Sequence, residues 1–167
     1  MNIPNTIKER FFLSFLSTTF FFCGGAIYVI YRDTNLRMFS WFKQLGLSSF
    51  ITYIRDNINV TFPNWVVYSL PDGLWMCSFI LAMRVIWLRD YSRLSLYTTL
   101  ILPIFIVFTE LLQFFNIFPG TYDANDLTCY LLPIIIYLIY FHYGKKNQVI
   151  RFSTCNGCLS VFCWWFR

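Results

Sequence analysis

The feature that most constrains this chain is a run of 21 consecutive residues, 11–31, without a single charged side chain. A helix needs about 20 mainly apolar residues to cross the hydrocarbon core of a bilayer. Further long apolar runs lie at about residues 71–88, 94–118 and 127–143. The sequence therefore predicts an all-α membrane protein, a bundle of four transmembrane helices.

The first run also follows two basic residues, Lys8 and Arg10, as the core of a signal peptide would. It is too long for such a core, and no A-x-A-like cleavage site follows it. We therefore expect a retained helix. The chain then divides into a single transmembrane domain over residues 1–144 and a C-terminal tail over residues 145–167.

The composition excludes an ordinary soluble domain. Hydrophobic residues make up 57% of the chain and charged residues 13%, whereas soluble domains carry about 25% charge. The net charge of +5 could suggest nucleic acid. The basic residues, however, fall between the apolar runs, where they set topology and contact anionic lipid. We expect the lipid bilayer, and no nucleic acid, as a partner.

The segment between the first two apolar runs, 32–70, is too polar to span a membrane. Its apolar residues alternate with Arg37, Lys43 and Arg55, a mixture typical of an interfacial helix lying on the membrane. The alternative is an ordinary loop. We expect the interfacial helix, placed between the first and second spans.

The tail is basic at first and then rich in Cys and Trp. Cys155 and Cys158 have the C-x-x-C spacing, which alone is weak evidence for metal or redox chemistry. We assign the tail no cofactor and no metal ligand, and its role stays open.

The basic residues also predict the orientation, since Lys and Arg are in excess on the cytoplasmic side. With the N-terminus inside, nine lie inside: Lys8, Arg10, Arg84, Arg89, Arg93, Lys145, Lys146, Arg151 and Arg167. Four lie outside: Arg32, Arg37, Lys43 and Arg55. We therefore expect both termini in the cytoplasm. Arg84, in the last turns of the second span, is expected to extend to the nearby surface.

In this orientation, four of the eight acidic residues fall at the outer end of the spans: Asp72, Glu110, Asp123 and Asp126. Asp72 and Asp123 could each be an N-cap. That does not explain Glu110, because a carboxyl two turns inside a span needs a partner, a proton or water. Gln113 lies three residues on, on the same helix face. The pattern predicts a small acidic cleft, and the alternative is hydrogen-bonded contact between helices.

Clustered carboxylates can bind a divalent cation, pair with a cationic or polyhydroxylated headgroup, or relay protons. Nucleophilic catalysis would need a base beside them. The only histidine, His142, falls at the opposite end of the fourth apolar run. The sequence therefore indicates binding more than catalysis and leaves metal-assisted hydrolysis open.

Three sequence pieces, in this order and spacing, resemble the VanZ-like family of small bacterial membrane proteins: PDGLW at 71–75, ELLQ at 110–113 and GTYDAND at 120–126. The resemblance covers roughly residues 65–143. Many members have an Arg before the Asp-x-x-Asp and an Asn four residues after it. This chain has Gly120 and Thr121 in place of the first and Tyr130 in place of the second. The resemblance implies a protein of the bacterial cell envelope associated with resistance to the glycopeptide antibiotic teicoplanin.

We therefore expect a protein of the bacterial inner membrane whose outward-facing acidic cleft meets an envelope lipid or a membrane-protein partner. The alternatives are a metal-dependent enzyme acting on a lipid-linked phosphate or sugar, and an accessory subunit of a membrane complex. The expected ligand-binding residues include Trp75 of the PDGLW motif. The full set is Asp72, Trp75, Glu110, Gln113, Asp123 and Asp126.

Overall fold

The computed structural model describes the backbone of residues 3–58 and 60–155, and the side chains of 6–58 and 60–147. Cys158 and the rest of the tail beyond residue 155 lie outside the described residues. The described chain forms helices and no strand, so the prediction of an all-α protein is confirmed. The helices are α1 (Ile3–Tyr31), α2 (Arg37–Gln44), α3 (Ser48–Asn57), α4 (Asn64–Tyr68), α5 (Leu70–Ile86), α6 (Arg93–Phe114) and α7 (Ala124–Cys155).

Three segments of these helices are long and apolar enough to cross a membrane: Thr6–Tyr31, Arg93–Phe114 and Ala124–Asn147. This confirms a membrane protein. The second predicted span corresponds to α5, which has 17 residues and is therefore about 26 Å long. α5 is therefore shorter than the three helices that contain these segments. Length and composition establish three spans, whereas the sequence predicted four.

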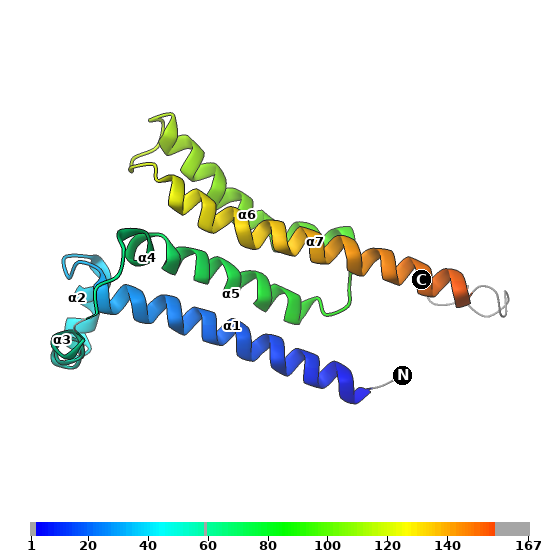
Figure 1. The fold of residues 1–167 in the computed structure, drawn as a ribbon, viewed down its shortest axis with the longest axis horizontal. Coiled ribbons are helices and arrows are strands. Elements are labelled where there is room, and N and C mark those ends of the chain that lie inside the picture. Colours follow the sequence, from blue (N-terminus) through cyan, green and yellow to red (C-terminus); the bar gives the residue numbers. More distant parts are fainter. Residues whose placement is uncertain (1–2, 59, 156–167) are drawn as a thin grey trace.

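The long helices form an open array with α5 at its centre (Figure 1). α1 lies antiparallel to α5, and α6 lies antiparallel to α7. α5 contacts both α1 and α7, whereas α1 has no contact with α6 or α7 among the residues described. The predicted bundle is therefore held together through α5. The start of α1 and the end of α7 lie at the same end of the molecule.

Glycines set how closely α5 approaches its neighbours. A Cβ on Gly24 of α1 would lie 2.9 Å from Nε1 of Trp75, and a Cβ on Gly73 of α5 would lie 2.9 Å from Cβ of Cys129. Both distances are shorter than van der Waals contact, so only glycine fits. Between α5, α6 and α7 lies a small buried core of Met76, Ile80, Leu100, Ile134, Tyr137 and Phe141.

The predicted interfacial helix is three short helices, α2, α3 and α4. Gly46, at a positive φ of 72°, ends α2 before α3 begins, which is a conformation that glycine adopts without strain. Arg55 of α3 fastens this region to the end of α1. Its Nε and Nη2 donate to the carbonyl of Val29 at 2.9 and 2.6 Å, and Nη2 also donates to the carbonyl of Arg32 at 2.6 Å. Arg55 thus satisfies backbone oxygens that the end of a helix leaves free.

The other helix boundaries follow local signals. Ser92 is the N-cap of α6 and accepts from the backbone N–H of Ser95 at 3.2 Å. α6 ends at Phe114, four residues before the predicted end. α7 continues past Gly144 to Cys155, so the described part of the tail extends the last helix.

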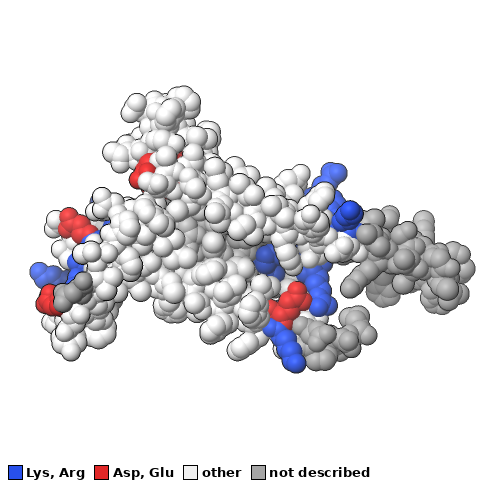
Figure 2. All heavy atoms as spheres, in the orientation of Figure 1, with Lys and Arg blue, Asp and Glu red and all other residues white. Residues whose placement is uncertain are grey.

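Charged side chains gather at the two ends of the molecule (Figure 2). Between them, the face in view is free of Lys, Arg, Asp and Glu. The basic residues of the end that holds the start of α1 belong to that helix, to the 87–92 loop, to the start of α6 and to the last part of α7. An uncharged belt between two charged rims is the surface that a bilayer requires.

Candidate functional site

Three carboxylates from three helices meet near the first turn of α5. We call them the acidic cluster: Asp72 of α5, Glu110 of α6 and Asp126 of α7. Asp126 and Glu110 both lie close enough to act electrostatically on Asp72. The sequence predicted that these residues fall at one end of the helices, and the fold brings them there because α5 and α7 start, and α6 ends, at that end (Figure 1).

Glu110 is the buried member of the acidic cluster, with 6% of its surface exposed. Its Oε1 accepts a hydrogen bond from the backbone N–H of Asp123 at 3.1 Å. This bond ties α6 to the start of α7. Glu110 therefore has a structural contact and also acts electrostatically on Asp72.

Asp123 and Asp72 differ in how they meet their helices. Asp123 precedes α7, and its Oδ1 accepts from the backbone N–H of Asn125 at 2.8 Å and from the Asn125 side chain at 3.0 Å. This is the N-cap predicted for it. Asp72 lies inside the first turn of α5, whose N-cap position is Ser69. Asp72 therefore does not cap α5, and it interacts with the other members of the acidic cluster.

Two residues join the acidic cluster that the sequence did not single out for it. The Tyr130 hydroxyl lies beside the Asp72 carboxyl and within electrostatic reach of Glu110 and Asp126. Arg32, one residue beyond α1, supplies the positive charge that acts on Asp72. Tyr130 lies four residues after Asp126, one helical turn along the same face, which is a signal that could have identified it.

The acidic cluster retains unused hydrogen-bonding capacity. Oδ1 of Asp126 and Nε of Arg32 are both buried without a partner. The Arg32 guanidinium lies over the rings of Tyr28 and Tyr68, at 5.1 and 4.8 Å. The cluster therefore combines three carboxylates, one tyrosine hydroxyl and one arginine, with polar atoms still free.

The other two predicted ligand-binding residues have contacts outside the acidic cluster. Gln113 packs against Gly120, where an added Cβ would come within 2.8 Å of its Nε2. Trp75 faces α1, and its Nε1 donates to the carbonyl of Phe21 at 3.2 Å. Its ring lies 5.4 Å from that of Tyr28.

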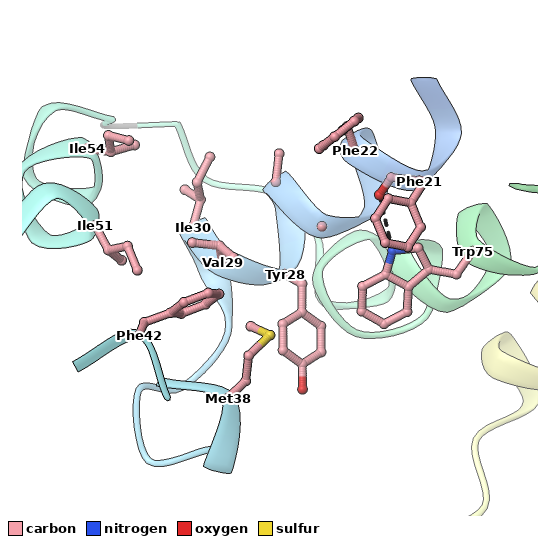
Figure 3. A pocket seen from close by; sticks show the side chains of 12 residues that line it. Phe21, Phe22, Tyr28, Val29, Ile30, Met38, Phe42, Ile51, Ile54 and Trp75 are labelled. Atoms are coloured by element: carbon pink, nitrogen blue, oxygen red, sulfur yellow. Dashed lines mark hydrogen bonds between the residues drawn. The ribbon is translucent and has the colours of Figure 1, made fainter. Parts of the chain in front are cut away.

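Trp75 borders an apolar hollow of about 580 Å³ between α1 and the short helices α2 and α3. Figure 3 shows Met38 and Phe42 of α2 and Ile51 of α3 facing this space. The hollow has almost no polar lining. The surroundings of Trp75 on this side are therefore apolar.

Arg84, near the other end of α5, does not extend to the surface as predicted. It is 3% exposed, and its guanidinium lies between the rings of Tyr91 and Tyr140, at 5.0 and 5.3 Å. The prediction was wrong because these tyrosines, from the 87–92 loop and from α7, cover a side chain that would be free on an isolated helix.

No three His, Cys, Asp or Glu side chains of the described chain lie close enough together to hold a metal ion. His142 lies on α7 close to Lys145, about four turns beyond Asp126 and away from the acidic cluster.

Comparisons of the chain with protein-family models, with curated proteins and with solved structures give no match.

Proposed function

We propose that this chain is a VanZ-like protein of the bacterial inner membrane, with α5 as a fourth, short span and both termini in the cytoplasm. The support for α5 as a span is its central position, in contact with helices on both sides. The support for the orientation is the excess of Lys and Arg at the end where α1 begins. The acidic cluster then faces the outside of the cell.

The proposed function is to bind a cationic or polyhydroxylated group of an envelope component at the acidic cluster. The observation behind it is the convergence of Asp72, Glu110 and Asp126 from three helices, with Arg32 as the one cation that acts on Asp72. Carboxylates beside a lipid-crossing region are costly and typically functional. Their excess over Arg32 leaves negative charge for a ligand to neutralise.

The carboxylates of the cluster come from three helices, so a ligand can meet them from several sides. They suit separate contacts with an amine or with several hydroxyls. The oxygen of the Tyr130 hydroxyl, which lies beside Asp72, adds a hydrogen-bond acceptor for such a group.

The function can be tested in a Gram-positive host by measuring the lowest teicoplanin concentration that stops growth. Expression of the chain should raise this concentration. Glu110→Leu and Glu110→Gln should both abolish the rise, at unchanged membrane levels of protein. The matched control is Asp56→Asn, which removes an exposed carboxylate of α3 and should retain full activity. A fully active Glu110→Gln variant would contradict the role of the acidic cluster.

The topology can be tested separately by labelling single cysteines in a variant without native cysteines. Asp33→Cys should react with a membrane-impermeant maleimide from outside the cell, and Lys145→Cys should react only after permeabilisation. Both positions are exposed. Labelling of both from the same side would contradict the proposed spans while leaving the antibiotic test unaffected.

A further inference from the structure

The buried arginine of α5, Arg84, has donors that the protein does not use. Its Nη1 donates to the backbone carbonyl of Asp90 at 3.1 Å. Its Nε and Nη2 are buried without any acceptor. The rings of Tyr91 and Tyr140 stack on the guanidinium and offset part of the cost of burying it. Two N–H groups of a buried cation thus remain free.

Arg84 also lacks a counter-ion. Within the described residues, the one ion pair joins Arg89 to Glu9, at 2.9 Å. A charge buried beside lipid is stabilised by an opposite charge or by hydrogen bonds to its donors. The backbone carbonyl of Asp90 meets only one of these needs, which leaves room for an anion from outside the chain.

Arg84 lines an apolar groove of about 440 Å³ whose floor is α5 and whose walls are α1 and α7. A volume of this size is typical of small-molecule sites. The walls are aliphatic and aromatic, and include Leu16 and Phe20 of α1, Leu81 of α5, and Leu132 and Ile136 of α7. The groove lies between α1 and α7, whose backbones do not approach each other closely among the described residues.

The groove continues along α5 toward the opposite end of the molecule. A second apolar hollow of about 410 Å³ shares Cys77, Leu132 and Pro133 with it and reaches Trp65 of α4. The two hollows together follow α5 over much of its length. A long, narrow and apolar space of this kind suits a hydrocarbon chain.

A second unused donor lines the same groove. Tyr137 is 3% exposed, and its hydroxyl is buried without a partner. Buried tyrosine hydroxyls usually find a partner. Two side chains that line the groove from two helices, Arg84 and Tyr137, therefore have buried donors that nothing in the described chain accepts.

The end of the molecule that holds Arg84 carries more basic residues than acidic ones, which are Glu9 and Asp90 among the described residues. The start of α1 brings Lys8 and Arg10, the start of α6 brings Arg93, and the last part of α7 brings Lys145 and Lys146. Basic residues at a membrane surface concentrate anionic lipid there. The charge around the groove therefore favours an anion over a neutral or cationic headgroup.

We propose that the groove between α1, α5 and α7 binds an anionic phospholipid of the surrounding bilayer, with its phosphate at Arg84 and Tyr137 and an acyl chain along α5. The Tyr140 ring, which covers the guanidinium and is 43% exposed, turns aside to admit the phosphate. This site is separate from the acidic cluster, which lies at the other end of α5.

The experiment measures lipid affinity for the detergent-purified full chain by native mass spectrometry, with phosphatidylglycerol as the anionic probe and phosphatidylcholine as the reference. Wild type should bind phosphatidylglycerol more tightly. Arg84→Met should weaken that binding about tenfold or more, since it removes charged hydrogen bonds. Arg93→Met, which removes an exposed arginine at the same end but outside the groove, should change it less than about threefold.

Two further variants locate the acyl chain and the hydroxyl. Ile136 and Ile139 of α7 are 58% and 52% exposed, but only Ile136 lines the groove. Ile136→Trp should weaken binding severalfold, and Ile139→Trp should not. Tyr137→Phe should weaken it about threefold.

The proposal is overturned if the two lipids bind alike, or if Arg84→Met and Arg93→Met weaken binding equally. Preferential binding of a free fatty acid would overturn the assignment to a phospholipid. If Arg84→Met does not fold, the pair at 136 and 139 together with Tyr137→Phe decides the outcome.

Discussion

The two ends of α5 bury charge in different ways. At its first turn, Asp72 has carboxylates, a tyrosine and Arg32 around it, so both signs of charge meet within the protein. At its last turn, Arg84 has a backbone carbonyl and two aromatic rings but no carboxylate. Both side chains suit the helix dipole, because a negative side chain is favoured at the start of a helix and a positive one at its end.

This difference indicates what each end lacks. The first end has an excess of carboxylates and needs a cation or hydroxyl donors. The last end has a single buried cation and needs an anion. The bilayer supplies anionic headgroups for the last end, whereas the cationic or polyhydroxylated group proposed for the first end belongs to an envelope component.

The largest expected effect contrasts two arginines. Arg55 donates three hydrogen bonds to backbone carbonyls, whereas Arg84 donates one. In detergent without anionic lipid, Arg55→Met should lower the free energy of unfolding by about 3 kcal/mol or more, and Arg84→Met by about half of that or less. Denaturant titration followed by circular dichroism measures both. Equal losses of stability in the two variants would contradict this difference between Arg55 and Arg84.

The next effect separates structure from charge at the acidic end. Glu110→Leu leaves the Asp123 N–H without its acceptor and should cost about 1–3 kcal/mol of stability. Glu110→Gln keeps an oxygen acceptor and should cost less than about 1 kcal/mol. The same titration distinguishes them. If the two variants lose stability equally, Glu110 acts through its charge and not through this hydrogen bond.

A smaller effect concerns the seam between α1 and α5. Gly24→Ala would place a methyl group 3.0 Å from the carbonyl of Pro71 and should cost about 1–2 kcal/mol. Gly25 has nothing within 4 Å of the same position, so Gly25→Ala should be neutral or stabilising by about 0.5–1 kcal/mol. Thermal unfolding of the two variants tests this. A destabilising Gly25→Ala would show that the seam is wider than the structure has it.

The smallest effect is expected for the exposed ion pair beside Arg84. Arg89 and Glu9 are 2.9 Å apart, with side chains 54% and 35% exposed. Arg89→Ala should cost less than about 1 kcal/mol. The loss should shrink further in high salt, because salt screens exposed charges. A loss of stability that is large and independent of salt would show that Arg89, rather than Arg84, is the important charge at this end.

Features that depend on neighbouring residues in the chain were predicted well. Long apolar runs must be helical beside lipid, since no other single segment satisfies its own backbone hydrogen bonds there. The sequence left Asp72 and Asp123 open as N-caps or ligand-binding residues, and only Asp123 accepts a first-turn N–H as an N-cap does. The limits of α7 were not predicted, because its helix continues into residues polar enough to leave the membrane.

Features that depend on the direction of a side chain needed the tertiary structure. Asp72 and Trp75 stand three residues apart in one motif, yet Asp72 meets the acidic cluster and Trp75 meets α1. Tyr130 was noted only as a departure from the VanZ-like pattern, and its hydroxyl lies beside Asp72.

The sequence by itself determined that this protein is a membrane protein, since the length and composition of its helices match a bilayer. It also determined which end of each helix holds charge. Only the tertiary structure decided which charges meet a partner, because α5 is packed on two sides and open to the groove on another. Packing is set by contacts between distant segments, such as Gly73 with Cys129, and no local pattern encodes them.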